Sequence, residues 1–313
     1  MPKTVLCRLP NHVGDCVMTL PALKLLADSG FTPHLTGKRF AEDLMLGLGW
    51  RFEPIEGNVA DDVGRTREIA ANLGGHPLGM LFPNSFGSAL LFRLAGVRSA
   101  GFPTDTRGFL LATKVPEPGV MHEVKRFFTA AREAIEAWGG TPARTEPEPR
   151  LGLTLLARHR AGARNILRDN QVSGRFVLLA PVARGLYHGK KKSWAHFDDL
   201  ARFVKKLGCT PLVLPSPHEV DEVRASCPSA RILPPTTLGN YAALCELASL
   251  VVANDSGISH VAAGVGARQI TLIGVTDPNR TGPWNPDAVV LGREGAWPSE
   301  DEVLGRVEEI LKA

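Results

Sequence analysis

The 313-residue sequence is poor in aromatic residues and cysteines and has no long apolar run. Phe, Trp and Tyr make up 6% of the chain, too few for the stacking surface that single-stranded nucleic-acid binders use. The five cysteines are scattered and include no C-x-x-C pair, which disfavours a zinc site or redox dithiol and fits a reducing compartment. No apolar stretch approaches ~18 residues and no signal-peptide pattern opens the chain, so we expect a cytoplasmic protein that does not span a membrane.

Motifs for dinucleotides, triphosphates and metal ions are also absent from the sequence. The first strand–helix junction, PNHVGD, has one glycine, and GVGARQ at 264–269 lacks the last glycine of G-x-G-x-x-G. The Gly-Lys pairs at 37–38 and 189–190 are each followed by a basic residue and lack the upstream glycine of a Walker A loop. These absences disfavour dehydrogenases and P-loop ATPases. No D-x-D-like pair is evident, and we expect no obligatory metal.

The composition indicates a folded chain of two domains. Apolar residues make up 44% and charged residues 22%, close to globular averages, and the length is about twice the ~150-residue domain prior. Lys and Arg number 36 against 32 Asp and Glu, a net charge of +4. This small excess suits anionic small molecules or an acidic membrane surface at least as well as nucleic acid, for which we would expect a dense basic stripe.

Strand-like and helix-like segments alternate along the chain. Strands are predicted at KTVLCRLP, RFVLLAP, TPLVLP, ARILPP, SLVVAND and ARQITLIG, with helices between them, for example WAHFDDLARFVKKLG and LGNYAALCELA. This alternation predicts an α/β fold of two Rossmann-like domains whose parallel sheets face a central cleft. The Pro- and Gly-containing stretch 139–150 is the predicted connector, which gives domains 1–150 and 151–297. A terminal helix is expected over 298–313, since Ser299 and Glu302 have capping-box spacing.

Two strand–helix junctions carry polar residues at the edge where ligands of parallel sheets bind. In PNHVGDCVMTLP, Gly14 allows close backbone approach, and Asp15 suits either a helix cap or a general base. In NDSGISH, the free N–H groups at the helix start form a ready anion site. Asp255 there suits a cap or an acceptor of bonds from sugar hydroxyls, and His260 suits either a core position or a ligand contact.

Two further loops follow predicted strands. HGKKKSW at 188–194 is either an ordinary solvated loop or a group of cations that neutralises a diphosphate or contacts acidic lipid. GVTDPNRTGPWNP at 274–286 is rich in Gly, Pro, Asn and Asp and predicts an ordered, turn-dense loop.

Together these segments resemble the ADP-heptose:lipopolysaccharide heptosyltransferases, a glycosyltransferase family with the two-Rossmann-domain GT-B fold. The resemblance runs through PNHVGDCVMTLPAL, FPNSFGSALLFRLAGV at 82–97, MHEVKRF at 121–127, KSW at 192–194, and NDSGISHVAAGVG followed by GVTDPNRTGPW. The segment PNSFGSALLFRLAG is more similar to the heptosyltransferase II branch, which adds the second heptose of the inner core, than to the first-heptose branch.

The resemblance implies roles for particular residues. Asp15, in the V-G-D match, resembles the catalytic base, and Lys192, in K-x-W, resembles the lysine that binds the donor diphosphate. The match to the donor-binding loop D-[ST]-G-x-x-H comprises Asp255, Ser256, Gly257 and His260. The residues expected on the acceptor side are Asn11, His12, Gly14, Asn84, Ser85 and His122.

The resemblance also implies an inverting transfer without a metal. Asp15 would take the proton of an acceptor hydroxyl, and Lys192 with a helix N-terminus would stabilise the departing ADP. The implied partners are ADP-heptose, a lipopolysaccharide core and anionic lipid at the inner face of the inner membrane of a Gram-negative bacterium, with no nucleic acid. By analogy with this fold, the terminal helix is expected to pack back on the N-terminal domain.

Some positions depart from the family pattern. Asn11 and His12 stand where a heptosyltransferase II usually has Ser-Trp, and Ala195 stands where proline often follows the tryptophan. Two alternatives therefore stay open. One is a GT-B glycosyltransferase that uses another nucleotide sugar, and the other is a non-catalytic protein of the same fold that binds a sugar nucleotide or glycan.

Overall fold

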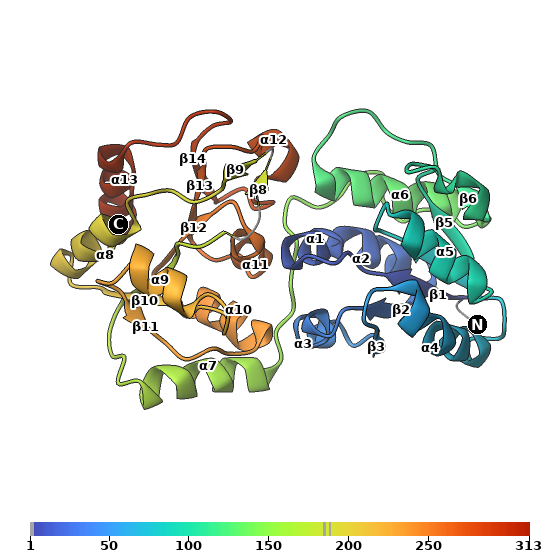
Figure 1. The fold of residues 1–313 in the computed structure, drawn as a ribbon, viewed down its shortest axis with the longest axis horizontal. Helices are drawn as coiled ribbons and strands as arrows, with labels where there is room; N and C mark the ends of the chain where they lie inside the picture. The colour runs from blue at the N-terminus through green and yellow to red at the C-terminus, as the bar shows by residue number, and fades with distance from the viewer. Residues whose placement is uncertain (1–2, 184–185, 188) are drawn as a thin grey trace. The chain divides into compact units, whose positions relative to one another are not determined.

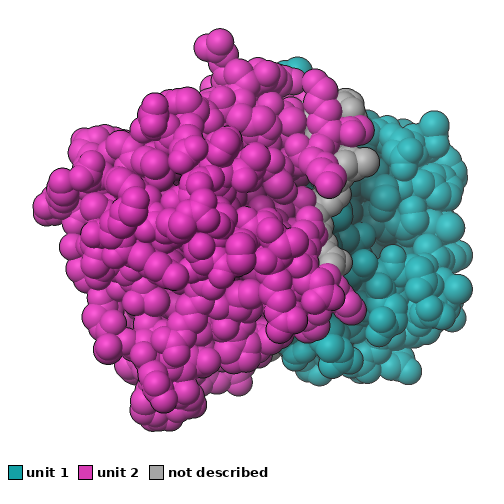
Figure 2. All heavy atoms as spheres, turned by 60° about the vertical axis from the view of Figure 1, so that its left-hand side comes forward, with its two compact units in different colours: residues 1–148 teal, residues 149–313 magenta. Residues whose placement is uncertain are grey.

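The computed structural model describes residues 3–183, 186–187 and 189–313. The chain divides into two compact units, which Figure 2 colours separately: residues 1–148, here unit 1, and residues 149–313, here unit 2. The division lies inside the stretch 139–150, where the sequence indicates a connector.

Unit 1 is a six-stranded parallel sheet with helices between successive strands (Figure 1). Its strands are β1 (Lys3–Arg8), β2 (Phe31–Gly37), β3 (Phe52–Pro54), β4 (Leu78–Leu81), β5 (Arg98–Gly101) and β6 (Thr113–Lys114). Its α-helices are α1 (Val13–Met18), α2 (Leu20–Asp28), α3 (Phe40–Met45), α4 (Val59–Asn72), α5 (Phe86–Leu94) and α6 (Glu123–Ala137). Short 3₁₀ turns are η1 (Leu46–Leu48) and η2 (Arg107–Leu110).

Unit 2 repeats this plan with a second six-stranded parallel sheet. Its strands are β7 (Phe176–Ala180), β10 (Thr210–Val213), β11 (Arg231–Ile232), β12 (Leu250–Asn254), β13 (Gln269–Ile273) and β14 (Val289–Gly292), and β8 (Leu186–Tyr187) pairs antiparallel with β9 (Lys190–Lys191). Its helices are α7 (Ala157–Asp169), α8 (Phe197–Lys206), α9 (Val220–Ser226), α10 (Leu238–Leu247), α11 (Gly257–Gly264), α12 (Pro278–Thr281) and α13 (Glu300–Lys312).

The strand order gives each sheet one switch point. Unit 1 has the order β3-β2-β1-β4-β5-β6, and unit 2 has the equivalent order β11-β10-β7-β12-β13-β14. The order reverses between β1 and β4 and between β7 and β12, and ligands of such sheets bind beyond the carboxyl ends of the strands at these switch points. The predicted α/β fold with parallel sheets is confirmed, and the loops after these four strands are the ones to examine.

The central strands of unit 2 are apolar because helices cover both faces of the sheet. All five residues of β7 and of β12 are buried, without the alternation of a half-exposed strand. Val177, Leu179 and Val252 pack in one core with Ile270 and Leu272 of β13. Asn254, at the end of β12, is the polar exception to this pattern.

The segment after the first strand forms two short helices, α1 and α2, which meet at Thr19. Pro21 lies in the first turn of α2, where its missing N–H removes no helical hydrogen bond. This proline therefore suits the start of the second helix.

The terminal helix α13 begins where the sequence predicts. Ser299 is its N-cap, and the Ser299 Oγ accepts a hydrogen bond from the Glu302 N–H at 3.2 Å. Its buried residues Val303, Val307 and Leu311 belong to the core of unit 2. This apolar stripe, spaced every four residues, is buried within unit 2, where α13 contacts α8. That the helix also packs back on the N-terminal unit stays a prediction.

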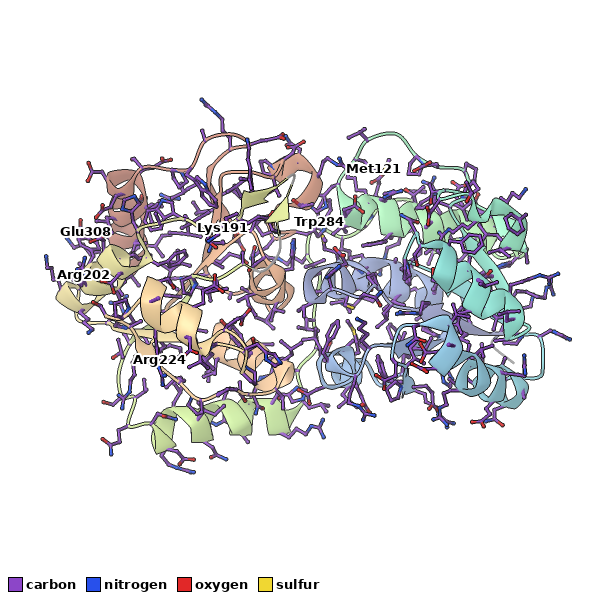
Figure 3. All side chains as sticks on the ribbon, in the orientation of Figure 1. Met121, Lys191, Arg202, Arg224, Trp284 and Glu308 are labelled. Atoms are coloured by element: carbon purple, nitrogen blue, oxygen red, sulfur yellow. The ribbon has the colours of Figure 1, made fainter. Side chains whose placement is uncertain are left out.

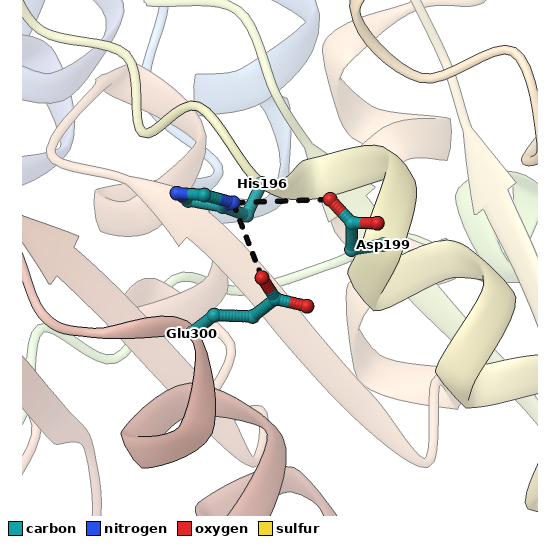
Figure 4. Close-up of side chains that lie close together, drawn as sticks. All are labelled: His196, Asp199 and Glu300. Carbon is teal, nitrogen blue, oxygen red and sulfur yellow. Dashed lines mark ion pairs between the residues drawn. The ribbon is translucent and has the colours of Figure 1, made fainter.

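Polar contacts join α13 to α8 at their N-terminal ends. The Nδ1 atom of His196 lies 3.3 Å from Glu300 Oε2 and 3.8 Å from Asp199 Oδ2 (Figure 4). Arg202, which projects from the outer side of α8 (Figure 3), pairs with Asp199 as well. These contacts fix the start of the terminal helix on α8.

Candidate active site

At the switch point of unit 2, Asn254 joins three segments. Its Nδ2 donates to the carbonyl oxygens of Ala180 at 3.3 Å and Pro181 at 2.8 Å, at the end of β7. Its Oδ1 accepts from the backbone N–H of Trp194 at 2.9 Å. Asn254 is fully buried, so these bonds hold the KSW segment against the carboxyl ends of β7 and β12.

Lys192 lies at the turn between β12 and α11. Its Nζ donates to the backbone carbonyl of Asp255 at 3.1 Å. Two residues on, the buried Trp194 ring donates from Nε1 to the Pro298 carbonyl at 3.0 Å and anchors the segment. The structure thus brings Lys192 together with the NDSG motif, although more than 60 residues separate them in sequence. His188, at the start of the basic loop, lies outside the described residues.

The Asp255 carboxylate accepts hydrogen bonds from other residues of unit 2. It is 4% exposed, and its Oδ2 accepts from the hydroxyls of Thr276 at 2.5 Å and Thr281 at 3.2 Å. Its Oδ1 lies 3.9 Å from Nε2 of His260. Ser256, and not Asp255, is the N-cap of α11. Asp255 therefore ties the loop after β13 to the end of β12.

The first turn of α11 has the features of an anion-binding site. Gly257 is its first helical residue, and the N–H groups of a first helical turn have no acceptor within the helix. The Oγ of Ser256 is buried and has no hydrogen-bond partner within the described part of the chain. His260 is also buried, one turn into the helix and beside Asp255. The donors and the helix dipole favour a negatively charged ligand here.

The loop after β13 is ordered by packing as well as by Asp255. A Cβ atom at Gly274 would overlap the ring of Trp297, so this position needs glycine. Asp277 caps α12, its carboxylate accepting from the Asn279 N–H at 2.9 Å. Thr276 precedes this short helix and Thr281 is its last residue, and the sequence alone indicates no role for either. Their partner Asp255 lies more than 20 residues away, and spacing along the chain does not reveal such a pair.

In unit 1, Asp15 is the third residue of α1, directly after the loop that follows β1. His12 occupies the N-cap position, so the interpretation of Asp15 as the cap is wrong. Asp15 is partly exposed, whereas Gly14 and Cys16 on either side are buried. Burial raises the pKa of the Cys16 thiol, and the neighbouring Asp15 carboxylate raises it further. Asp15 is thus a partly exposed carboxylate in the first turn of α1, next to the exposed N-cap His12.

A buried arginine supports the loop before α1. Arg8, the last residue of β1, is 2% exposed, and its Nη2 donates to Oδ1 of Asn11 at 2.7 Å. Its Nη1 donates to the Leu9 carbonyl, and the Cys16 thiol donates to the Pro10 carbonyl at 3.0 Å. Burial lowers the pKa of Arg8, and the nearby Asp62 carboxylate opposes this. Asn11 and His12 are exposed, and the Asn11 amide oxygen is engaged by Arg8.

A second buried arginine supports the loop after β4. Arg107 is fully buried; its Nη2 donates to Asn84 Oδ1 at 3.1 Å, its Nε to the Phe102 carbonyl at 2.9 Å and its Nη1 to the Pro83 carbonyl. Burial lowers the pKa of Arg107 to about 10. Ser85 is the N-cap of α5 and accepts from the N–H of Ser88 at 3.3 Å. The sequence gives no signal for either arginine, because each is a lone cation in an otherwise ordinary segment.

The predicted residues thus fall on two switch points. In unit 1, the loop after β1 and the first turn of α1 carry Asn11, His12, Gly14 and Asp15, and the loop after β4 carries Asn84 and Ser85. His122 is the N-cap of α6, where its Nδ1 accepts from the Val124 N–H at 3.2 Å. Lys192, Asp255, Ser256, Gly257 and His260 gather in unit 2.

One group of side chains in the described residues offers nitrogen and oxygen ligand atoms close together. His196, Asp199 and Glu300 have such atoms within 4.8 Å of one another, at the starts of α8 and α13. All three already form ion pairs, and Arg202 also engages Asp199. The independence from metal stays a prediction.

Known proteins are similar to this chain over almost its whole length. The model of glycosyltransferase family 9 (heptosyltransferase) matches residues 68–309. The structure is similar to that of E. coli ADP-heptose LPS heptosyltransferase II, with a TM-score of 0.76, 21% identity and coverage of 99% of this chain and 98% of that chain. It is also similar to a family 9 glycosyltransferase from Veillonella parvula, with a TM-score of 0.81, 15% identity and coverage of 99% and 97%.

A third similar structure is E. coli heptosyltransferase WaaC with ADP, with a TM-score of 0.72, 19% identity and coverage of 98% of this chain and 99% of that chain. No curated protein matches the sequence. At these identities the structural likeness establishes the GT-B-like fold. Among the described residues, no helix combines the length and the apolar character needed to span a bilayer.

Proposed function

The chain belongs to glycosyltransferase family 9, the heptosyltransferase family, and we propose that it is an inverting enzyme that moves heptose from ADP-heptose to the inner core of lipopolysaccharide. One observation carries the donor half of this proposal. Lys192 and the N-terminus of α11 meet at the switch point of unit 2, where Asn254 and Asp255 hold the backbone in place.

The charge distribution supports a phosphate-bearing donor on unit 2. Residues 149–313 hold 20 Lys and Arg against 16 Asp and Glu, whereas residues 1–148 hold 16 of each. The excess positive charge of the chain thus belongs to the unit with the anion-binding turn. The Lys192 ammonium and the first-turn N–H groups at Ser256 and Gly257 would bind the diphosphate and stabilise the charge that ADP gains on leaving.

Asp15 would serve as the general base. Transfer forms a bond from the acceptor oxygen to the anomeric carbon and breaks the bond from that carbon to ADP, with inversion, and Asp15 takes the hydroxyl proton. The Asp15 side chain is partly exposed at the carboxyl end of β1, where an acceptor on unit 1 can reach it. Asp255 has its oxygens engaged by Thr276, Thr281 and His260, which suits a positioning role better than proton transfer.

The branch and the location are part of the same proposal. The heptosyltransferase II-like segment PNSFGSALLFRLAG forms the Arg107-supported loop and α5, which favours an acceptor that already carries one heptose. Exposed Lys190 and Lys191 of β9 (Lys191 is labelled in Figure 3) would meet anionic lipid at the cytoplasmic side of the inner membrane, where such an acceptor is anchored.

Nucleotide specificity and acceptor dependence test this proposal together. Calorimetry should show ADP binding with clear preference over UDP and GDP, and ADP release from ADP-heptose should require a truncated core. A preference for UDP or GDP would indicate another nucleotide sugar. Binding of ADP without acceptor-dependent release would indicate a protein that binds the sugar nucleotide without catalysis.

A further inference from the structure

Two exposed phenylalanines lie side by side on unit 1. Phe86 is 37% exposed and Phe109 is 73% exposed, and their ring centroids are 6.1 Å apart with planes inclined at 53°. Phe86 begins α5 after β4, and Phe109 lies in η2 after β5. Because β4 and β5 are parallel neighbours, both rings come from segments that leave the carboxyl edge of the sheet, the edge that carries Asp15.

The segments that carry these rings are held rigidly. The Phe86 N–H donates to Asp105 Oδ2 at 2.9 Å, which links the loop after β5 to the start of α5. Asp105 and Thr106 both have left-handed backbone conformations, with φ of 53° and 54°, which non-glycine residues seldom adopt and which cluster at functional sites. The buried Arg107 donates hydrogen bonds to Asn84 and to the Phe102 carbonyl and so links the same two loops.

We propose that Phe86 and Phe109 form a stacking platform for a sugar ring of the acceptor. This inference rests on the proposed function and assigns a binding subsite within it. A sugar ring has an apolar C–H face of about the size of one aromatic ring, and its hydroxyl edge needs polar partners. Asn84 and Ser85 supply polar groups directly before Phe86. A strained, doubly anchored scaffold under exposed rings is expected where a ligand needs the rings in one fixed arrangement.

A glycan fits this platform better than a bilayer does. Membrane-binding surfaces combine a broad apolar face with a cluster of Lys and Arg that attracts anionic lipid. Here the apolar face consists of two rings, the adjacent Asp105 is a carboxylate, and Arg107 is buried beneath them. Residues 1–148 also carry equal numbers of basic and acidic side chains, so unit 1 offers no net attraction to an anionic surface.

The test uses the full-length enzyme and a truncated lipopolysaccharide core that carries one heptose and has been deacylated to make it water-soluble. Phe109→Ala should raise the acceptor KM about three- to tenfold, the factor expected for one aromatic contact, while the KM for ADP-heptose stays unchanged. Phe109→Tyr should retain the wild-type acceptor KM because it retains the ring. Leu94→Ala is the matched control, since Leu94 is 47% exposed at the other end of α5.

The possible outcomes distinguish a failure of the stacking platform from a failure of the proposed function. Wild-type heptose transfer with an unchanged acceptor KM in Phe109→Ala would overturn the platform and leave the function standing. An effect confined to binding of phosphatidylglycerol vesicles would overturn it in favour of a membrane contact. If the wild type transfers no heptose, the function fails, and saturation-transfer NMR with the deacylated core decides the platform: binding that Phe109→Ala weakens supports it, and no binding or equal binding refutes it.

Discussion

Asn254→Asp tests the polar junction that holds the donor side together. The substitution keeps the shape of the side chain and the oxygen that accepts from Trp194. It removes the Nδ2 group that donates to the carbonyls of Ala180 and Pro181. The site is fully buried, so a charged carboxylate would face two carbonyl oxygens without water. We therefore expect the new carboxyl to be protonated in the folded state.

The expected loss of unfolding free energy follows from that protonation. Keeping a carboxyl with an unfolded pKa near ~4 protonated at pH 7 costs about 4 kcal/mol, at 1.36 kcal/mol per pH unit. The protonated carboxyl has one O–H donor for the two carbonyls, so one hydrogen bond is lost, which costs about 1 kcal/mol more. The folded pKa is raised, so the loss grows as the pH rises: about 5 kcal/mol at pH 7 and about 2.5 kcal/mol at pH 5.

The assay is urea unfolding followed by tryptophan fluorescence at both pH values. Asn165→Asp, at an exposed position of α7, is the isosteric control and should change the unfolding free energy by less than about 0.5 kcal/mol. Wild-type stability in Asn254→Asp, or an equal loss at pH 5 and pH 7, would refute the assignment of Asn254 as a buried donor to β7.

Four further predictions concern catalysis, ligand binding, pH dependence and thiol chemistry. Asp15→Asn should lower kcat about 10²- to 10⁴-fold in steady-state assays and leave donor affinity nearly unchanged; a variant with most of its activity removes Asp15 from proton transfer. Lys192→Ala should weaken ADP binding, and an unchanged affinity by calorimetry would contradict the placement of the diphosphate. Burial lowers the pKa of His34 from its ordinary 6.5, with Glu53 opposing, so the unfolded chain binds a proton that the folded chain does not. Stability should therefore fall as the pH drops below about 6.5, by up to about 1.4 kcal/mol per pH unit, and His34→Leu should remove that contribution in urea titrations. The buried Cys16, whose thiol pKa is raised, should react with a disulfide reagent at pH 8 only as the protein unfolds; rapid labelling of the native protein would show that α1 packs differently.

Strands that form continuous apolar runs could be predicted from sequence, and three short strands of unit 1 could not. FVLLA and LVVAN are apolar runs, and they form β7 and β12. LGML, RSAG and TK form β4, β5 and β6, although none has the length or the β-branched content of a strand. They are strands because β1 starts a parallel sheet that each of them extends in turn, which is a property of the assembled unit.

The candidate site also has one part that the sequence predicts and another that it does not. The run from Asp255 to His260 is local, so its place at a strand–helix turn was predictable from the sequence. The partners that shape it are remote: Asn254 bonds to Pro181 across 73 residues, and Asp255 bonds to Thr276 across 21. In unit 1 the contacts of Arg107 with the loop after β4 span about as many residues as a whole strand–helix repeat. Such pairs exist only after the sheet has formed.

The most direct test of the account is a product measurement. The purified protein is incubated with ADP-heptose and truncated lipopolysaccharide cores that carry no heptose or one heptose, and the cores are analysed by mass spectrometry. We predict the addition of a single heptosyl residue to the one-heptose core, accompanied by one ADP. No mass change in either core, or addition of a different sugar when other nucleotide sugars are supplied, would contradict the proposal that this chain transfers heptose.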